Sequence, residues 1–384
     1  MKKKYLALAS ICAGTLFLAA CGNLGSSGTT DSVSQATQQS TKGYQTTGQT
    51  DDSDYQGVIE NGRYLTSKAR GVGIIQNSEN MLNLKSFENG LTTLSKEQFP
   101  TKDYIFREGQ LLSKATVTDW LGRKSKDNPT GLNPEDNGEK DADKRNPIYV
   151  QQIEEQDYMQ EKDGKLTLAG ITIGIGMNRK DYYQKEEYGA MYTTDISKEK
   201  MVEEGKKAAA EVLKRVRKLD GASDVPIMIC MYEQAPNDSL VGGSFYAYSV
   251  TDSGDTLGKW KDTDLQSSVL PATATSSAIN DNDESSFEAF KNKTQSFFPN
   301  LAGVTARAKY KDKTLQELHV NITTQFYSET EIRSFTQFVA KMAKTYLPGG
   351  IPIDITIKGS DGTVQAFLAR ETGNSSFYTH VFAE

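Results

Sequence analysis

The sequence has little of the chemistry on which most catalytic and metal sites depend. Its 384 residues include three cysteines, Cys12, Cys21 and Cys230, and two histidines, His319 and His380. Two of the cysteines lie in or beside the first twenty residues, so the rest of the chain has one thiol and cannot form an internal disulfide. Two histidines leave almost no basis for a zinc site or a histidine-centred triad. We therefore predict no cofactor, no metal site and no catalytic residue.

Basic clusters and long apolar runs are also scarce. The formal net charge is −6, and the one run of three basic residues is Lys2-Lys3-Lys4 at the N-terminus. An acidic chain without a longer basic cluster is a poor nucleic-acid binder, so we predict no nucleic-acid partner. The one apolar run that could contact a bilayer, Leu6 to Ala20, has fifteen residues and is too short for a stable transmembrane helix.

The N-terminus has the three parts of a lipoprotein leader. The three lysines precede the apolar run, which ends in Leu18-Ala19-Ala20 directly before Cys21. Small residues before a cysteine at this place resemble the bacterial lipobox, in which the thiol is alkylated by diacylglycerol and the chain is cut before it. The alternative is an ordinary signal peptide with an incidental cysteine. We predict a signal peptide over 1–20, lipidation of Cys21 by lipoprotein processing enzymes, and anchoring on the outer face of the cell membrane.

Residues 21–57 form a polar segment after the predicted cleavage site. Between Gly22 and Gly57, all but six residues are Ser, Thr, Gln, Gly, Asn or Asp. Such a composition cannot bury a core, so we expect a disordered tether that separates a folded body from the membrane.

The folded body reads as a duplicated α+β unit. Two amphipathic helices, over 197–219 and 328–347, have apolar residues at three-and-four spacing. Each is preceded by a predicted hairpin and followed by two strands, the first of which opens with a β-branched residue and a proline, Val225-Pro226 or Ile351-Pro352. Shorter helices ending in Phe-Pro, at 87–100 and 287–299, also resemble each other. We predict two related units with the order hairpin–helix–strand–strand, over 58–250 and 251–384, the first with insertions at 121–146 and 178–196.

One loop has the residues of a binding site. Arg and Asn side chains can bind a carboxylate or an amide, Trp can supply an apolar floor, and a glycine allows an unusual turn between two prolines. The alternative is a structural lid held by Asx-turns. The candidate ligand-binding residues are Trp120, Arg123, Lys124, Asn128, Gly131 and Asn133.

Other motifs favour structural interpretations. The glycines at 170, 174 and 176 lack the spacing of a dinucleotide motif and indicate close packing on a strand. Cys230 lies in an alternating apolar strand and is expected to be a buried, inert thiol, and His380 is expected to be structural. The acidic loop 135–143 lacks the ligand pattern of a calcium loop and is expected to be solvated.

Besides the lipobox leader, the segments 61–71, 87–90, 94–100, 120–123 and 128–134 have a recognisable sequence pattern. Together they resemble the CamS sex-pheromone precursor lipoproteins of Gram-positive bacteria. The resemblance implies that the cleaved leader is the source of an apolar peptide pheromone. The segment that would provide it, directly before the lipidated cysteine, is Gly14, Thr15, Leu16, Phe17, Leu18, Ala19 and Ala20.

Two classes of function follow from the sequence. The first is a non-enzymatic surface lipoprotein whose leader yields a signalling peptide and whose body binds a peptide or a cell-wall component. The alternative is an extracytoplasmic hydrolase acting on a cell-wall component, with a pair of carboxylates that would face one cleft and differ in pKa.

Overall fold

The computed structural model describes residues 44–49, 51–72, 80–273, 278–297 and 303–382. The predicted signal peptide, Cys21, the candidate pheromone segment and most of the tether lie outside the described residues. No helix in the described ranges is long and apolar enough to cross a membrane.

The last part of the predicted tether is folded. Strand β1 (Gln45–Thr46) pairs with β2 (Val58–Glu60), which pairs with β3 (Arg63–Tyr64). Tyr55 packs against an apolar cluster of the body, and its hydroxyl donates a hydrogen bond to the carbonyl of Phe99. Tyr44 and Tyr55 are two of the few residues that depart from the polar composition of this segment, and Tyr55 gives it a side chain to bury.

Six strands form the first large sheet, in the order β11-β10-β9-β6-β5-β4. Its parallel pair, β6 and β9, is connected through helix α3, and the other pairings are antiparallel. Between β6 and α3 the predicted insertion at 178–196 forms the hairpin β7–β8. The strands are β4 (Ile105–Glu108), β5 (Val150–Lys162), β6 (Lys165–Met177), β7 (Lys180–Gln184), β8 (Met191–Asp195), β9 (Ile227–Glu233), β10 (Ser244–Thr251) and β11 (Trp260–Asp262).

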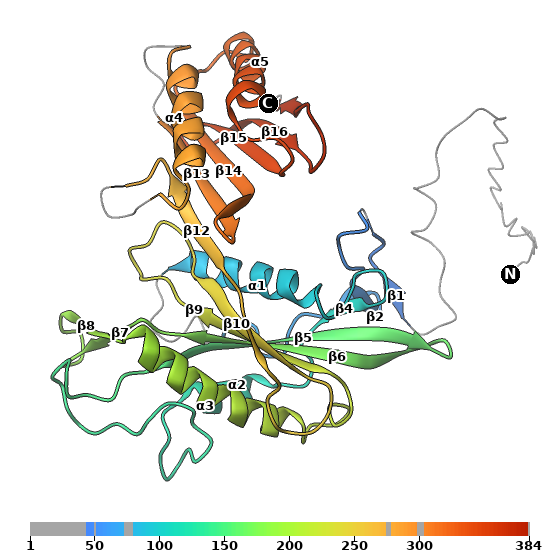
Figure 1. Cartoon of the computed structure of the whole chain (residues 1–384), viewed down its shortest axis with the longest axis vertical. Coiled ribbons are helices and arrows are strands. Elements are labelled where there is room, and N and C mark those ends of the chain that lie inside the picture. Colours follow the sequence, from blue (N-terminus) through green and yellow to red (C-terminus); the bar gives the residue numbers. More distant parts are fainter. Residues whose placement is uncertain (1–43, 50, 73–79, 274–277, 298–302, 383–384) are drawn as a thin grey trace, which may run out of the picture. The chain divides into compact units, whose positions relative to one another are not determined.

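Helices cover both faces of this sheet. Helix α1 (Met81–Ser95) lies on one face, and α2 (Lys114–Leu121) and α3 (Lys198–Val216) lie on the other, as Figure 1 shows. Both faces are therefore apolar. Close packing on the α1 face explains the glycines of β6, because a Cβ added at Gly170 would lie 2.2 Å from Phe99 and one at Gly174 would lie 2.6 Å from Phe87. The prediction of close packing is confirmed.

The second large sheet repeats this topology. Its order is β12-β13-β14-β15-β16-β17, and its parallel pair, β14 and β15, is again connected by a helix, α5 (Glu329–Tyr346). Ile353 of β15 lies opposite Leu318 of β14, as Ile227 of β9 lies opposite Ile171 of β6. The prediction of two related α+β units is confirmed. The strands are β12 (Leu265–Leu270), β13 (Gly303–Lys311), β14 (Thr314–Thr324), β15 (Ile353–Gly359), β16 (Val364–Arg370) and β17 (Tyr378–Val381).

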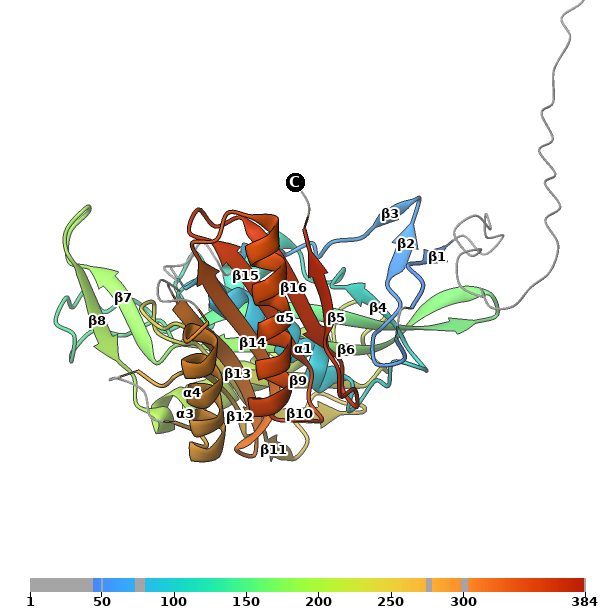
Figure 2. The same ribbon diagram turned by 90° about the horizontal axis from the view of Figure 1, so that it is seen from above.

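The two shorter helices are not equivalent, although their sequences resemble each other. Helix α4 (Asp281–Gln295) packs beside α5 on one face of the second sheet (Figure 2), whereas α1 and α3 lie on opposite faces of the first. The reason is the composition of the other face. Thr172 of β6 and Met228 of β9 pair on the α1 face of the first sheet. The equivalent pair in the second sheet is His319 and Asp354, whose polar side chains cannot form an apolar interface with a helix.

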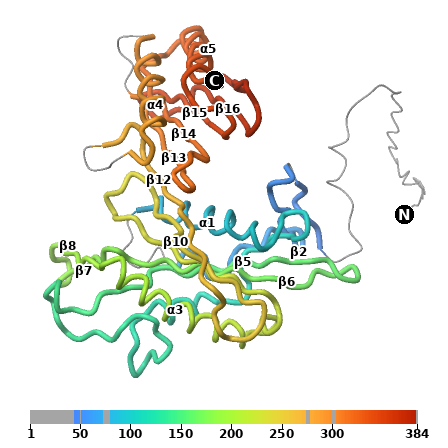
Figure 3. Tube along the Cα trace, viewed as in Figure 1, coloured from blue at the N-terminus to red at the C-terminus, as the bar shows by residue number. Residues whose placement is uncertain are grey.

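The change from the first sheet to the second comes later than the predicted division at 250/251. Strand β11 still belongs to the first sheet, because Asp262 pairs with Ala247 of β10. Strand β12 begins at Leu265, so the chain changes sheet within the intervening two residues, a step that can be followed in the trace of Figure 3. Glu97, just after α1, forms an ion pair with Lys311 of β13, with 3.3 Å between Oε1 and Nζ.

Candidate functional site

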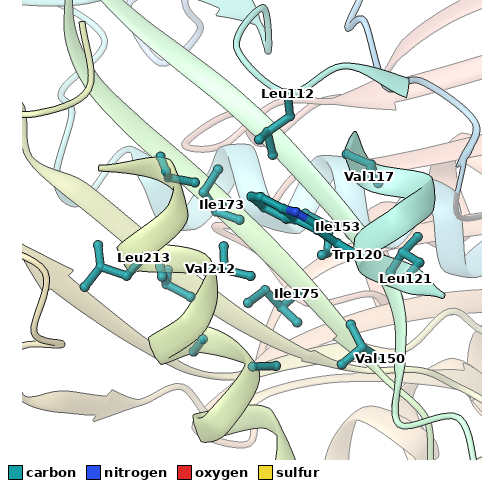
Figure 4. Close-up of a cluster of buried hydrophobic side chains, with 14 of the residues drawn as sticks. Leu112, Val117, Trp120, Leu121, Val150, Ile153, Ile173, Ile175, Val212 and Leu213 are labelled. Carbon is teal, nitrogen blue, oxygen red and sulfur yellow. The ribbon is translucent and has the colours of Figure 1, made fainter. Parts of the chain in front are cut away.

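The tryptophan of the candidate loop is a core residue. Trp120 is on α2, is 6% exposed and points into the apolar cluster that α2 and α3 form on the first sheet, as Figure 4 shows. The guanidinium of Arg215, on α3, lies 5.3 Å from the indole centroid. Trp120 therefore fixes the start of the loop and does not provide an exposed floor for a ligand.

Asn133 fixes the end of the loop. Its side chain is buried, and Nδ2 donates to the carbonyls of Leu121 and Val150 at 2.8 and 3.0 Å. Its Oδ1 accepts from the backbone N–H groups of Tyr149 and Val150, both at 2.8 Å. A side-chain amide has two donors and two acceptor positions, and all four are used. Asn133 therefore has no hydrogen-bonding capacity left for a ligand.

The middle of the loop packs tightly on its own backbone. Nδ2 of Asn128 donates to the carbonyl of Asp119 at 2.7 Å. A Cβ added at Gly131 would lie 2.5 Å from the carbonyl carbon of Arg123, so glycine is required by close approach. Lys124 is exposed. Asn128 and Gly131 therefore stabilise the conformation of the loop. This is the role expected for them if the loop is a structural lid.

Arg123 is the candidate residue that lines a cavity. The cavity has a volume of about 310 Å³ and lies at the carboxyl ends of β6 and β9, the parallel pair of the first sheet. In open α/β sheets, ligands bind outside the carboxyl ends of the strands, where the connections from neighbouring strands separate and leave a crevice. The wall of the cavity is formed by the residues that directly follow β6 and β9, by the start of β7 and by the end of α2. The residues that line it include Leu121, Arg123, Ile148, Asp181, Gln234 and Pro236.

Asp136 and Asp181 act on Arg123 electrostatically, but no carboxylate of the described residues lies within ion-pair distance of it. Asp181 pairs with Arg145 at 2.5 Å, and Arg179 pairs with Glu233 at 2.9 Å. The guanidinium of Arg123 donates to the carbonyls of Pro134 and Asn146, at 3.0 and 2.8 Å, and forms no ion pair with any carboxylate of the described residues. Burial lowers the pKa of Arg123, but a guanidinium stays charged in proteins.

A second, smaller cavity holds a group of carboxylates that the sequence did not single out. It is about 150 Å³ in volume, and Glu88, Glu108 and Glu154 line it together with Arg70. Burial, followed by the neighbouring carboxylate of Glu88, raises the pKa of Glu154 from 4.5 to about 8. Burial also raises the pKa of Glu88, and Glu108 pairs with Arg70 at 3.6 Å. The three residues come from α1, β4 and β5, so no local motif could have indicated them.

The raised pKa of Glu154, a half-buried residue, predicts that the stability of the protein depends on pH. Its folded-state pKa is raised, so the unfolded chain binds fewer protons than the folded one between pH 4.5 and 8, and stability falls as the pH rises through this window. We expect Glu154→Gln to reduce this loss by about 2–4 kcal/mol. Urea unfolding at pH 5, 6.5 and 8 measures it.

The matched control for Glu154→Gln is Glu139→Gln, in the exposed acidic loop. We expect this control to leave the pH dependence of the unfolding free energy unchanged. Parallel stability curves for the wild type and Glu154→Gln would show that the carboxyl of Glu154 is ionised in the folded protein at all three pH values.

Of the two remaining candidates, Cys230 is buried in the core and His380 lies at the surface. Cys230 is fully buried, and burial raises the pKa of its thiol well above the ordinary value, which confirms the inert thiol. His380 is exposed on β17, with its ring 4.7 Å from that of Phe382. No group of three or more potential ligands among the described histidine, cysteine, aspartate and glutamate side chains could hold a metal ion.

A polar group on the uncovered face of the second sheet was also missed by the sequence analysis. His319 hydrogen-bonds to Asp354 through Nδ1, and its Nε2 lies 2.8 Å from Glu317. These two carboxylates raise the pKa of His319 to about 9. Glu317 and His319 stand two apart on β14 and so share a face, which the alternating pattern could have indicated, but the third member lies on β15.

Comparisons with known proteins agree with this description. The family model described as the CamS sex pheromone cAM373 precursor matches residues 64–376. The crystal structure of a sex pheromone precursor from Lactobacillus salivarius subsp. salivarius is 65% identical, with a TM-score of 0.86. That match covers 89% of this chain and 100% of the other chain. No curated protein sequence matches the chain.

A second solved structure shows the same relationship at lower identity. The C-terminal domain of the sex pheromone staph-cAM373 precursor from Staphylococcus aureus is 29% identical, with a TM-score of 0.69, and the match covers 80% of this chain and 99% of that domain. The family model spans most of this chain, including the first large sheet and all strands of the second except β17. The chain therefore belongs to the CamS sex pheromone cAM373 precursor family.

Proposed function

We propose that this protein is a sex pheromone precursor that is lipid-anchored on the outer face of the cell membrane, with an extracytoplasmic binding module as its folded body. The observation that carries the proposal is the combination of a CamS body with a lipobox leader, Leu18-Ala19-Ala20-Cys21, at its N-terminus. Diacylglycerol on the Cys21 thiol would supply two acyl chains, which is enough for stable anchoring.

The leader is the proposed source of the signal. Cleavage before Cys21 leaves Ala20 with a free carboxylate, and a second cut before Gly14 would release the heptapeptide Gly14–Ala20. The peptide carries no charged side chain and is mostly apolar, which suits passage between cells and an apolar receptor site.

The body is proposed to bind a peptide or a cell-wall component through the cavity beside Arg123. A binding role is favoured over catalysis there, because this cavity has a cation with no described carboxylate at ion-pair distance and amide side chains but no nucleophile with an adjacent base.

A bioassay tests the signalling role. Synthetic Gly14–Ala20 would be added to cells that carry a pheromone-responsive plasmid, with a peptide of the same composition in scrambled order as the control. We expect the native order to induce the plasmid response and the scrambled order to have no effect. Equal responses, or no response to either peptide, would contradict the signalling role, and only the lipoprotein role would remain.

A hydrolase acting on a cell-wall component is the second candidate function. The observation in its favour is the cavity of Glu88, Glu108 and Glu154, in which burial keeps one carboxyl protonated near neutral pH, as a general acid requires. Release of reducing ends from purified wall material, lost in Glu154→Gln, would support it. Wall material left intact by the wild-type protein would exclude it for that substrate.

A further inference from the structure

Two carboxyl groups of the cavity between α1, β4 and β5 have no cation of the described residues at ion-pair distance. Glu88 of α1 and Glu154 of β5 are half-buried and line this cavity. Arg70, the basic residue of its wall, pairs with Glu108 at 3.6 Å. Arg70 also acts electrostatically on Glu88 and Glu154, but it forms no ion pair with either of them. One guanidinium therefore faces three carboxyl groups, and the cavity has an excess of acidic groups.

These two carboxyl groups also keep acceptor positions for a ligand. Glu154 accepts one hydrogen bond, from Nε2 of Gln156 at 3.4 Å, and Glu88 accepts none from the part of the chain that the structure describes. By contrast, Glu108 also accepts the backbone N–H of Ser67 at 2.6 Å. A carboxylate has about four acceptor positions, so Glu88 and Glu154 can receive the N–H groups of a cationic ligand.

A buried amide nitrogen at the same cavity has no acceptor. Gln152, on β5, is 7% exposed, and its Oε1 accepts from Nε2 of Gln234 at 3.2 Å. Its own Nε2 donates to no described residue, yet it is not one of the buried polar atoms that are closed off from solvent. Because Gln152 lines the cavity, this nitrogen can be reached from it. It is therefore a donor for an oxygen of a ligand.

The acidic groups and the amide nitrogen are close together. Residues two apart on a strand point to the same side and stand about 7 Å apart, so Gln152 and Glu154 face the same space. The cavity has a volume of about 150 Å³, which is space for about five waters, so it accommodates a group of few heavy atoms. A ligand that contacts both sides needs a cation and an oxygen on neighbouring carbon atoms. The ammonium and carbonyl groups of one amino-acid residue have this arrangement.

We infer that this cavity binds the N-terminal residue of a peptide, with the ammonium group on Glu88 and Glu154 and the carbonyl oxygen on the amide nitrogen of Gln152. A small first residue, glycine or alanine, fits the volume. The site is separate from the cavity beside Arg123, and the inference does not rest on the binding role proposed there. It also differs from the hydrolase candidate, because an ammonium stabilises the ionised form of Glu154, whereas a general acid has to be protonated.

The test is isothermal titration calorimetry on the mature full-length chain in detergent at pH 6.5. The probes are alaninamide, lactamide, in which a hydroxyl replaces the ammonium, sec-butylamine, which has no carbonyl, and the tripeptide alanylglycylglycinamide. Loss of the charge-assisted hydrogen bonds should make lactamide bind about tenfold to a hundredfold more weakly than alaninamide. Loss of the carbonyl should make sec-butylamine bind about twofold to tenfold more weakly, and the tripeptide should bind at least as tightly as alaninamide.

Proton release gives a second measurement at the same site. Burial and then Glu88 and Glu108 raise the pKa of Glu154 to about 8, against the opposite effect of Arg70, so the empty cavity holds a proton on Glu154 at pH 6.5. An ammonium beside this carboxyl favours loss of that proton. Binding of alaninamide should therefore release up to one proton, and binding of lactamide should release none. Titrations in two buffers with different ionisation enthalpies measure the release.

Variants then locate the site. Glu88→Gln should weaken binding of alaninamide by about tenfold and leave lactamide nearly unchanged, whereas Glu139→Gln, in the exposed acidic loop outside the cavity, should change neither. Gln152→Met should weaken binding of alaninamide and not of sec-butylamine. Circular dichroism would show that each variant is folded, and the ratio between two probes on one variant is independent of the folded fraction.

Each contrary outcome removes a stated part of the inference. Equal affinity for alaninamide and lactamide would overturn the ammonium site, and equal affinity for alaninamide and sec-butylamine would overturn the contact with Gln152. Binding of alaninamide without binding of the tripeptide would overturn the peptide as ligand. Absence of binding for all four probes would overturn the site as a whole. None of these results affects the binding role proposed for the cavity beside Arg123.

Discussion

Cells that express the Cys21→Ala variant should incorporate no labelled fatty acid into the protein. In the proposed lipidation the thioether to diacylglycerol forms on the Cys21 thiol, and alanine has no nucleophile at that position. The lipoprotein peptidase cuts before a lipidated cysteine, so the variant should also keep its leader and migrate as the longer precursor. Labelling with a radioactive fatty acid, followed by gel electrophoresis, measures both effects.

The control for the anchor is Cys12→Ala, which removes the thiol within the predicted leader. This variant should incorporate label as the wild type does. Label in the Cys21→Ala chain, or its loss in the Cys12→Ala chain, would show that the anchor had been assigned to the wrong residue.

Asn133→Ala should produce the largest loss of stability among substitutions in the loop after α2. The change removes four hydrogen bonds at once and leaves the carbonyls of Leu121 and Val150 and the N–H groups of Tyr149 and Val150 without their partner. Because these groups are at a buried position, we expect a decrease of about 3–5 kcal/mol in the free energy of unfolding. Chemical denaturation followed by circular dichroism measures it.

The matched control for Asn133→Ala is Asn374→Ala, an exposed asparagine near the C-terminus. A surface change of this kind is expected to stay within about 0.5 kcal/mol of the wild type. A similar, small effect at both positions would mean that water replaces the hydrogen bonds of Asn133 and that the loop does not depend on its side chain.

The secondary structure and the duplication could be predicted because their signals are local and strong. The helix expected over 197–219 is α3, capped by Ser197, and the one over 328–347 is α5, where Ser328 and Glu331 form a capping box. A buried stripe and a clear cap each define a helix without reference to the rest of the chain. The proline after a β-branched residue likewise predicted the start of the parallel strand in both units.

The features that could not be predicted depend on which face of a sheet is polar and on contacts between residues far apart in the sequence. The sequences of α1 and α4 are alike, yet the face on which each packs is decided by strands such as β14 and β15, where His319 and Asp354 make one face polar. The cavity beside Arg123 also combines segments more than a hundred residues apart, since Gln234 follows β9. No spacing between residues in the sequence indicates that these segments lie side by side in the fold.

The candidate loop shows a further limit of sequence patterns. Its Trp, Asn and Gly residues have the composition of a binding site, but the same residue types are those that cap helices and close turns. The structure uses Asn128, Gly131 and Asn133 to hold the loop, and the loop in turn holds Arg123 at the cavity. Which role each side chain has depends on whether its polar atoms are already bonded to the backbone.

The central claim is that processing of this chain yields an anchored body and a free peptide. Mass spectrometry of the culture fluid and of the membrane fraction, from cells that express the full chain, tests it most directly. The account predicts the mass of Gly14–Ala20 in the fluid and a mature chain that begins with diacylglyceryl-modified Cys21, and predicts that both are absent for Cys21→Ala. A mature chain that begins at another residue, or a leader that leaves no heptapeptide in the fluid, would contradict it.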